Sequence, residues 1–551
     1  MKMLNKKHRS MITGLMLMIA SLVFIISILS LSSCRSLDDD KIIDVGGVTA
    51  VNINLLGADY AAIEGNGGAE VSLSSLTPNS LNSITQHHTS LISPSLFLEA
   101  EMSSVGIEAQ ASSNKNALAV VDGNQIETGV MFRVIAYFTS SGSYQIHKDY
   151  IIGQKAEPLM LDAGKSYTII VYSYGTSVLP TITSEQLSNI KESYTPFDKS
   201  HRDFMYQRIN NYIPDGNNPN NVLNIKLRHK VTEITTTVNS LIGDINSISA
   251  SITGTYIEGK FGLSTNGKFI NSGTLMPQGL IYSGNFPTKT VKFNSVLLAV
   301  PSSVRGGFSA DVNIGGNTRR VELPQSFNIT PEYKNNLTIN LKTCGAYIAP
   351  GVWREFMCHN LGADLGASPM VPSPSIHGAK YQFGVQTGEN RRYVSQTNDY
   401  TTNAVPWSLS GTSTLWNSGT DLNPKKTTND PCPDGFRVPT KLEWDGVLKN
   451  NKIEAVGPVG NSSSSNAFIS GFKLGTLFLP TAGYRKVGFR DGDIYQRGKW
   501  ALYWTSNSVN SSIASNVFIG LSVETNEAQG TLEESLNSKA SGFAIRCIAE
   551  R

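Results

Sequence analysis

Four cysteines in the C-terminal part of the chain are the residues best suited to covalent chemistry. The sequence has five cysteines, and Cys344, Cys358, Cys432 and Cys547 lie in its last two-fifths. In exported proteins, an even number of cysteines in one region is typical of disulfides. Three pairings are open, and we favour Cys344–Cys358 with Cys432–Cys547, because the second bond ties the middle of a domain to its last strand. A zinc site would need a Cys-x-x-Cys pair, which the sequence lacks, so we predict no metal and no cofactor.

The fifth cysteine, Cys34, ends an apolar segment that follows a basic N-terminus and carries no charge from residue 11 to residue 31. A transmembrane anchor is one interpretation, since about 20 apolar residues can span a bilayer. The small residues before a single cysteine favour a signal peptide instead. The segment Leu31–Cys34 resembles the lipobox of bacterial lipoproteins, which implies a signal peptide over residues 1–33 and acylation of Cys34 with palmitate or a similar chain. Residues 34–45 form an acidic tether, and Asp38–Asp40 resembles the surface-export signal of Bacteroidetes lipoproteins, so we expect an exposed lipoprotein of the outer membrane.

Length and composition exclude several classes of protein. A chain of 551 residues suggests about three domains. Only 16% of the residues are charged and 49 are glycine, which excludes a disordered chain or a coiled coil. Without residues 1–33 the chain has 42 Lys and Arg against 43 Asp and Glu. It therefore lacks the charge excess that would attract nucleic acid.

The elements that must position these cysteines are mostly strands. From about residue 45 to residue 343, apolar and polar residues alternate between Gly, Asn, Ser and Pro turns, with examples at residues 134–138, 167–174 and 223–227. This pattern predicts two β-sandwich domains, which we place at residues 46–245 and 246–343.

The amino-acid composition changes after Cys344, because all six tryptophans follow it. This predicts a separate module over residues 344–551. Thr440 and Glu443 have the spacing of a helix capping box, and Trp444 and Val447 would share one face of that helix. One short helix among many strands predicts an α+β module.

The β region resembles the fimbrillin, or FimA/Mfa-like, subunits of Bacteroidetes fimbriae. The resemblance is carried by residues 132–137 (FRVIAY), 161–168 (LDAGKSYT), 172–174 (YSY) and 227–231 (LRHKV). It implies two transthyretin-like sandwiches, and assembly with other fimbrial subunits by strand addition after a protease removes an N-terminal strand.

Two departures from that family matter. No Lys or Arg lies between Lys41 and Lys115, so a trypsin-like protease has no site there. The chain also continues past the end of the fimbrillin region, where a donated strand would lie. A subunit that accepts a strand but cannot donate one suits the tip of a fibre. The alternative is a surface lipoprotein that binds glycan or protein ligands and never polymerises.

The C-terminal module resembles the Fibrobacter succinogenes major paralogous domain, which is similar to the C-type-lectin-like fold. Its motifs follow in order along nearly the whole module: Trp353, 360–362 (NLG), 381–384 (YQFG), 431–440 (PCPDGFRVPT), 443–444 (EW), 479–485 (LPTAGYR), 503–506 (YWTS) and 542–547 (GFAIRC). Tyr484, Arg485 and Trp504 are candidate ligand contacts, although core positions are the other interpretation. The sugar-binding triplets of calcium-dependent lectins are missing, and Asp491-Gly492-Asp493 suggests a turn rather than a cation site.

The same motifs also bear on an enzymatic function. Formylglycine-generating oxidases are similar in fold, and residues 435–440 with Glu443 and Trp444 resemble one of their segments. Their chemistry needs a close pair of reactive cysteines, whereas Cys547 lies far in sequence from the other cysteines of this chain. The sequence contains no nucleophile elbow, His-Glu-x-x-His helix or phosphate loop. We therefore predict a non-enzymatic surface lipoprotein that acts in cell adhesion as a minor or tip fimbrial subunit.

Overall fold

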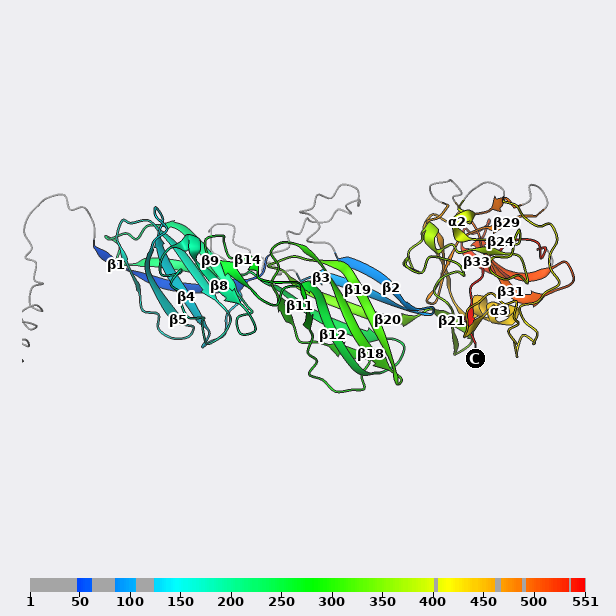
Figure 1. Ribbon diagram of the computed structural model, residues 1–551, viewed down its shortest axis with the longest axis horizontal. Coiled ribbons are helices and arrows are strands. Elements are labelled where there is room, and N and C mark those ends of the chain that lie inside the picture. The colour runs from blue at the N-terminus through cyan, green and yellow to red at the C-terminus, as the bar shows by residue number, and fades with distance from the viewer. Residues whose placement is uncertain are drawn as a thin grey trace, which may run out of the picture. The chain divides into compact units, whose positions relative to one another are not determined.

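The structure, a computed structural model, describes residues 47–61, 85–105, 123–400, 405–460, 467–487, 492–534 and 537–550. Strands form most of the regular structure there, so the predicted mainly β class is confirmed (Figure 1). The predicted signal peptide, the predicted acidic tether and Cys34 lie outside the described residues.

The first β-sandwich is built on a sheet of seven strands. Their order is β5 (Tyr144–Ile151), β4 (Met131–Phe138), β7 (Tyr167–Ser173), β9 (Met205–Tyr212), β10 (Asn221–His229), β1 (Val48–Asp59) and β6 (Leu159–Asp162). A second sheet has the order β14 (Lys268–Asn271), β13 (Gly259–Gly262) and β8 (Tyr194–Phe197), and a 3-10 helix, η2 (Ile190–Glu192), precedes β8. The sheets share an aromatic core in which Phe204 stacks on Phe261 with ring centroids 4.2 Å apart.

The described residues divide into two compact units, of which the smaller comprises residues 47–51, 160–165 and 213–221. Within it, Ala163 N–H donates to Gly47 O at 2.8 Å. The Asn221 side-chain amide donates to the carbonyl oxygens of Asp215 and Asn218, both at 2.8 Å. These bonds hold residues 213–220 as a loop, as the run of Pro, Asp, Gly and Asn predicts.

The second β-sandwich belongs to the larger unit and also has two sheets. One has the order β16 (Thr290–Lys292), β11 (Thr232–Ser240), β20 (Lys334–Thr343), β3 (Leu96–Ser104) and β2 (Gln86–Ser93), with β17 (Val296–Leu298) also paired to β11. The other has the order β15 (Met276–Gly279), β12 (Ile245–Thr255), β18 (Val304–Ile314) and β19 (Asn317–Ile329). Apolar side chains from both sheets form one core, including Ile234, Leu337, Ile252 and Val312.

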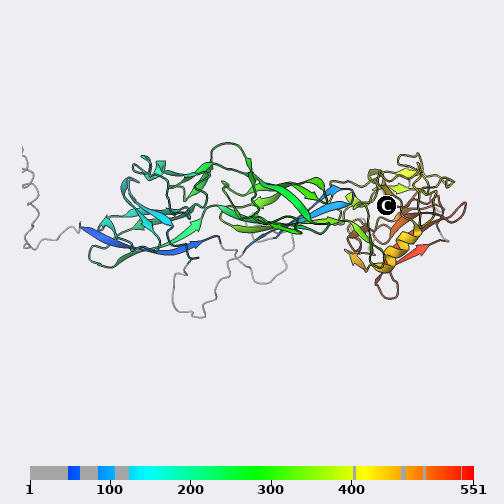
Figure 2. The ribbon, with the colours of Figure 1, turned by 90° about the horizontal axis from the view of Figure 1, so that it is seen from below.

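Strand pairing crosses the domain boundary that the sequence placed at residue 245. The hairpin β2–β3 comes early in the chain, yet β3 pairs with β20 of the second sandwich; Figure 2 shows these blue strands among green ones. In the other direction, β13 follows residue 245 but pairs with β8 of the first sandwich. Alternation shows that a segment is a strand but not which strand it pairs with, so a linear division misses such exchanges.

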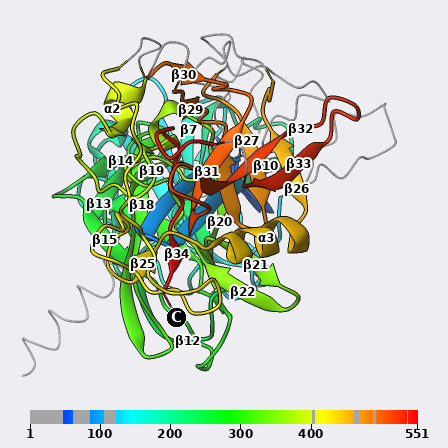
Figure 3. The same cartoon turned by 90° about the vertical axis from the view of Figure 1, so that its right-hand side faces the viewer.

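The C-terminal module combines short strands with the helix α3 (Lys441–Asn450), which lies at the side of the strands (Figure 3). Its strands are β21 (Gly345–Ala349), β22 (Val352–Glu355), β23 (Lys380–Tyr381), β24 (Tyr393–Val394), β25 (Phe436–Arg437), β26 (Ile453–Val456), β27 (Gly471–Leu474), β28 (Leu477–Pro480), β29 (Tyr484–Arg485), β30 (Ile494–Tyr495), β31 (Ala501–Ser508), β32 (Ala514–Leu521), β33 (Ala528–Glu533) and β34 (Ile548–Ala549). Two further short helices are η3 (Pro374–Ile376) and α2 (Gln396–Asp399).

The helix α3 forms for the reason that its sequence predicts. Thr440 is the N-cap, its hydroxyl accepts from Glu443 N–H, and the Glu443 carboxylate accepts from Thr440 N–H, which confirms the capping box. Trp444 and Val447 are fully buried on the face of α3 that joins the module's core.

Candidate functional site

Both disulfides lie in or beside this module. The structure joins Cys344 to Cys358 and Cys432 to Cys547, the pairing that the sequence favoured. The sequence separations are 14 and 115 residues. The second bond ties the loop before β25 to the end of the chain, where β25 pairs with β34.

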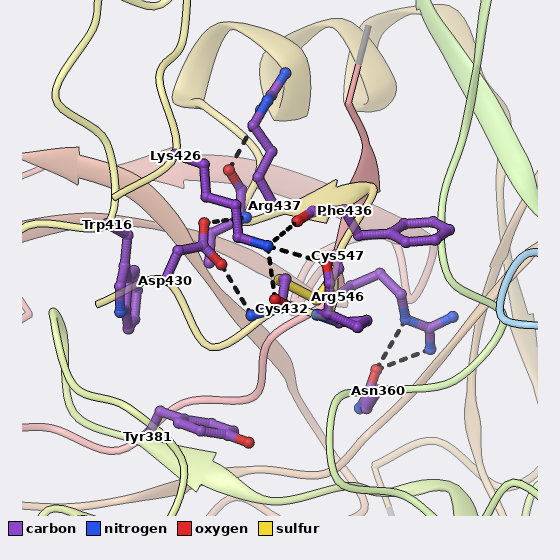
Figure 4. Close-up of a disulfide and its surroundings, with 12 residues drawn as sticks. Asn360, Tyr381, Trp416, Lys426, Asp430, Cys432, Phe436, Arg437, Arg546 and Cys547 are labelled. Atoms are coloured by element: carbon purple, nitrogen blue, oxygen red, sulfur yellow. Dashed lines mark hydrogen bonds between the residues drawn. A yellow bond between two sulfur atoms is a disulfide. The ribbon is translucent and has the colours of Figure 1, made fainter. Parts of the chain in front are cut away.

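The loop that leads into β25 is held by two charged side chains beside the Cys432–Cys547 bond (Figure 4). Lys426 Nζ donates to three carbonyl oxygens within residues 432–436, at 2.7–2.9 Å. Asp430 accepts from the backbone N–H groups of Cys432 and Val438, both at 2.9 Å. Burial raises the pKa of Asp430 to about 6 against these hydrogen bonds. Lys426, Asp430 and the disulfide therefore fix the backbone of this loop, in which residues 433–435 are exposed.

Two arginines of the sequence motifs are also structural. Arg437 forms a two-pronged ion pair with Glu443 at 2.8 and 2.5 Å, and both side chains are 4% exposed. Arg546 is buried, and its guanidinium donates to Asn360 Oδ1 at 2.8 and 3.0 Å and to Phe478 O at 2.8 Å. A buried guanidinium is stable only when its N–H groups donate to hydrogen-bond acceptors. The carboxylate, amide and carbonyl oxygens around Arg437 and Arg546 are these acceptors.

Two of the three predicted ligand contacts are core residues instead. Trp504 has no exposed surface, and its indole N–H donates to Tyr381 O at 2.7 Å. Arg485 is also fully buried. A side chain without exposed surface cannot contact a ligand outside the protein, so the core interpretation holds for both. Tyr484 is half-buried beside Phe543, at 5.4 Å between ring centroids, and remains a candidate contact.

Arg485 belongs to a buried charge cluster that sequence reasoning missed. Around Asp399, at the end of α2, lie Lys380 Nζ at 3.1 Å, Arg485 Nε at 2.8 Å and Arg497 Nη2 at 2.8 Å. Burial works to raise the pKa of Asp399, but the three cations together lower it. Burial lowers the pKa of Lys380 to about 8 despite the carboxylate. These residues lie far apart in sequence, so only the fold brings them together.

This cluster and its neighbours have the character of a structural site. Its four charged groups are each at most 6% exposed. The nearby His377 is buried, and burial, Lys380 and Arg497 lower its pKa to about 3, so the imidazole is neutral. The ion pairs of Asp399 with Lys380 and Arg485 join α2 to β23 and β29.

The segment at residues 491–493 agrees with the turn interpretation where it is described. Asp491 lies outside the described residues. Gly492 has φ of +82°, and a Cβ there would lie 2.3 Å from Val405 O, so only glycine fits. Lys486 N–H donates to Asp493 O at 3.0 Å, which closes the β29–β30 hairpin. In the described part of the chain, no group of three or more His, Cys, Asp or Glu residues is arranged to hold a metal ion.

No helix among the described residues is both long enough and apolar enough to cross a membrane. No protein-family model and no curated protein matches the chain.

Several solved structures are similar to parts of this chain. A candidate cell adhesion protein from Bacteroides uniformis aligns over 39% of this chain and 90% of its own, with 13% identity and a TM-score of 0.29. One from Bacteroides fragilis aligns over 56% and 97%, with 12% identity and a TM-score of 0.28. The tip fimbrial protein of Porphyromonas gingivalis, solved with a C-terminal truncation, aligns over 40% and 94%, with 10% identity and a TM-score of 0.26. At these TM-scores the likeness carries no argument, so the function of the chain must be argued from its own residues.

Proposed function

We propose that this chain is a lipidated protein of the outer-membrane surface that acts in cell adhesion as a minor or tip fimbrial subunit. In this proposal it is a fimbrillin-family member that accepts a strand from a neighbouring subunit. Its lectin-like module, residues 344–551, contacts a glycan or protein ligand. The observation that carries the proposal is the position of β20.

Strand addition requires a donor with a terminal strand that is free to leave its own sheet. β20 is the last strand of the second sandwich, and it lies between two partners. It pairs in parallel with β11 over eight residue pairs and antiparallel with β3 over nine. The chain then continues directly into Cys344 and the disulfide-bonded module. β20 is therefore unsuited to donation, which supports a place at the end of a fibre.

A second candidate function, a surface lipoprotein that does not polymerise, is favoured by the sequence around β1. The nearest basic residues that bracket β1 are Lys41 and Lys115. A trypsin-like cut at Lys41 leaves β1 in place, and a cut at Lys115 removes β3 as well, which strips β20 of nine pairs. Neither cut removes β1 without also removing β3. An incoming strand would therefore have to displace β1 from its sheet.

Immunogold microscopy of sheared surface material, with antibodies against residues 344–551, separates the two functions. The tip proposal predicts gold at fibre ends. Gold on the outer membrane, with none on fibres, would contradict it and support the non-polymerising lipoprotein. N-terminal sequencing of the fibre-bound protein adds a second readout, because it shows directly whether β1 is retained.

The lipid anchor has its own test. Metabolic labelling with a palmitate analogue should label the wild-type protein and not Cys34→Ala. Label that survives in Cys34→Ala, or its absence from the wild type, would contradict the lipobox interpretation. Cys344→Ala is the matched control, because Cys344 is in a disulfide and its loss should leave the label unchanged.

A further inference from the structure

A hollow of about 400 Å³ lies at the junction of the second sandwich and the C-terminal module. Seven of the described residues, from both parts of the larger unit, line it: Leu241, Ile242, Lys342, Thr343, Trp353, Glu355 and Thr476. Its volume falls within the range of small-ligand sites, about 300–1,000 Å³. None of these residues belongs to the charge cluster around Asp399.

The walls of the hollow are held by short-range bonds, so its shape is already formed. Thr476 Oγ1 accepts from Gly345 N–H at 2.9 Å and donates to Thr343 O at 2.6 Å. The β2–β3 turn closes the same junction, because Cys344 N–H donates to Ser95 O at 2.8 Å and Cys358 N–H to Pro94 O at 2.7 Å. A preformed site loses less conformational entropy when a ligand binds.

Trp353 supplies an aromatic surface at the hollow. Its indole ring lies against Gly345, where an added Cβ would come within 2.7 Å of the ring, and Tyr347 meets it edge-on at 5.3 Å between centroids. It is partly exposed, unlike Trp416, Trp444 and Trp504, which are fully buried. Within the described ranges its indole N–H has no hydrogen-bond partner. A solvent-accessible indole with a free donor is suited to bind a ligand that is apolar on one face and polar at its edge.

The polar groups at the hollow balance in charge. Glu355 is exposed and accepts a hydrogen bond from Ser95 Oγ at 2.9 Å, which leaves its other oxygen available. Lys342 is ion-paired with Glu99. One carboxylate and one already paired ammonium give no excess of positive charge, so the site does not favour a phosphate or a carboxylate. The side chains of Lys342 and Glu355 instead favour a neutral ligand with several hydroxyl groups.

We propose that this hollow is a glycan-binding site for a neutral pyranose, whose C–H face stacks on Trp353 while a hydroxyl donates to Glu355. Leu241, which is 70% exposed, covers the apolar side of the same sugar. The inference deepens the proposed adhesive function, on which it rests, by naming the ligand class and its site. It does not depend on polymerisation.

The test uses the full-length protein in detergent and an array of neutral oligosaccharides of glucose, galactose and N-acetylhexosamines. We expect the wild type to bind at least one of them. For the oligosaccharide that binds most tightly, titration calorimetry should show a tenfold or larger loss of affinity in Trp353→Ala. Trp353→Phe should stay within threefold, because it keeps an aromatic face. Val352→Ala is the matched control and should leave affinity unchanged, since Val352 is exposed in the same strand but does not line the hollow.

Glu355→Gln keeps the test decisive if Trp353→Ala does not fold. It preserves shape and the bond from Ser95 but weakens acceptance of a sugar hydroxyl, so affinity should fall about fivefold. Absence of array binding, binding of peptides alone, or equal affinity in wild type and Glu355→Gln would overturn the proposal. Gold at fibre ends without glycan binding would overturn this inference and leave the tip function intact. Glycan binding without gold on fibres would overturn the tip function and leave this inference intact.

Discussion

The two disulfides should contribute unequally to stability, because they close loops of very different length. The chain-entropy relation gives about 3.0 kcal/mol for the 14-residue separation of Cys344–Cys358. It gives about 4.8 kcal/mol for the 115-residue separation of Cys432–Cys547. Replacing each pair by alanine should therefore destabilise the module by amounts that differ by about 1.8 kcal/mol.

Tryptophan fluorescence during urea denaturation measures this difference in the full-length protein. All six tryptophans lie between residues 353 and 504, so the signal reports unfolding of the C-terminal module and not of the sandwiches. The free energy of unfolding in water is obtained by linear extrapolation. Because all four cysteines are buried, the two double-alanine variants are matched in burial as well as in composition.

The two disulfides are coupled in space, because Met357 N–H donates to Cys547 O at 2.9 Å and Arg546 donates to Cys358 O at 2.6 Å, so the two losses should not simply add in the quadruple variant. Reduction of the wild type should give the same free energy of unfolding as the quadruple variant. Equal losses in the two double variants, or a larger loss from the short loop, would refute loop closure as the source of the stability.

Three further predictions concern the same module and the same assay. Asp430 has a folded pKa of about 6, above the unfolded value, so its native state binds the proton more tightly and stability should fall as pH rises from about 4 to 6. Relative to Asp430→Asn the fall should be roughly 3 kcal/mol, and a rise would contradict the assignment. Asp399→Asn should cost about 3–5 kcal/mol because it leaves three buried cations without their carboxylate, whereas Glu534→Gln in the exposed ion pair with Lys441 should cost below about 1 kcal/mol. Thr440→Ala should cost about 1 kcal/mol through loss of the N-cap of α3, and a neutral result would show that tertiary packing alone holds that helix.

Local features of the fold could be predicted from the sequence, since they depend on neighbouring residues. The capping box at Thr440 and Glu443 predicts α3, and alternation at residues 223–227 predicts β10. The apolar residues from 291 to 300 do not show by themselves where a strand ends, and the structure has two short strands there, β16 and β17, on either side of residues 293–295.

Partners that lie far apart in sequence could not be predicted in the same way. The pairing of β3 with β20 joins residues more than 230 positions apart, and alternation carries no information about such a partner. Arg485 looked like a ligand contact because its neutralising partner, Asp399, is 86 residues away. The hollow at Trp353 could not be predicted for a related reason, because its walls come from four separate segments of the chain.

The central position of β20 also has a mechanical consequence. A pulling force on the C-terminal module enters the second sandwich at Thr343 and acts along the axis of β20. Eight pairs with β11 and nine with β3 then bear the load together in shear, whereas a strand at a sheet edge, pulled sideways, would lose its pairs one at a time. The Cys344–Cys358 bond sits just beyond that entry point, so the first hairpin of the module cannot be peeled open before the load reaches the sheet. This junction is therefore suited to resist tension, which is the load that the proposed adhesive function would place on it.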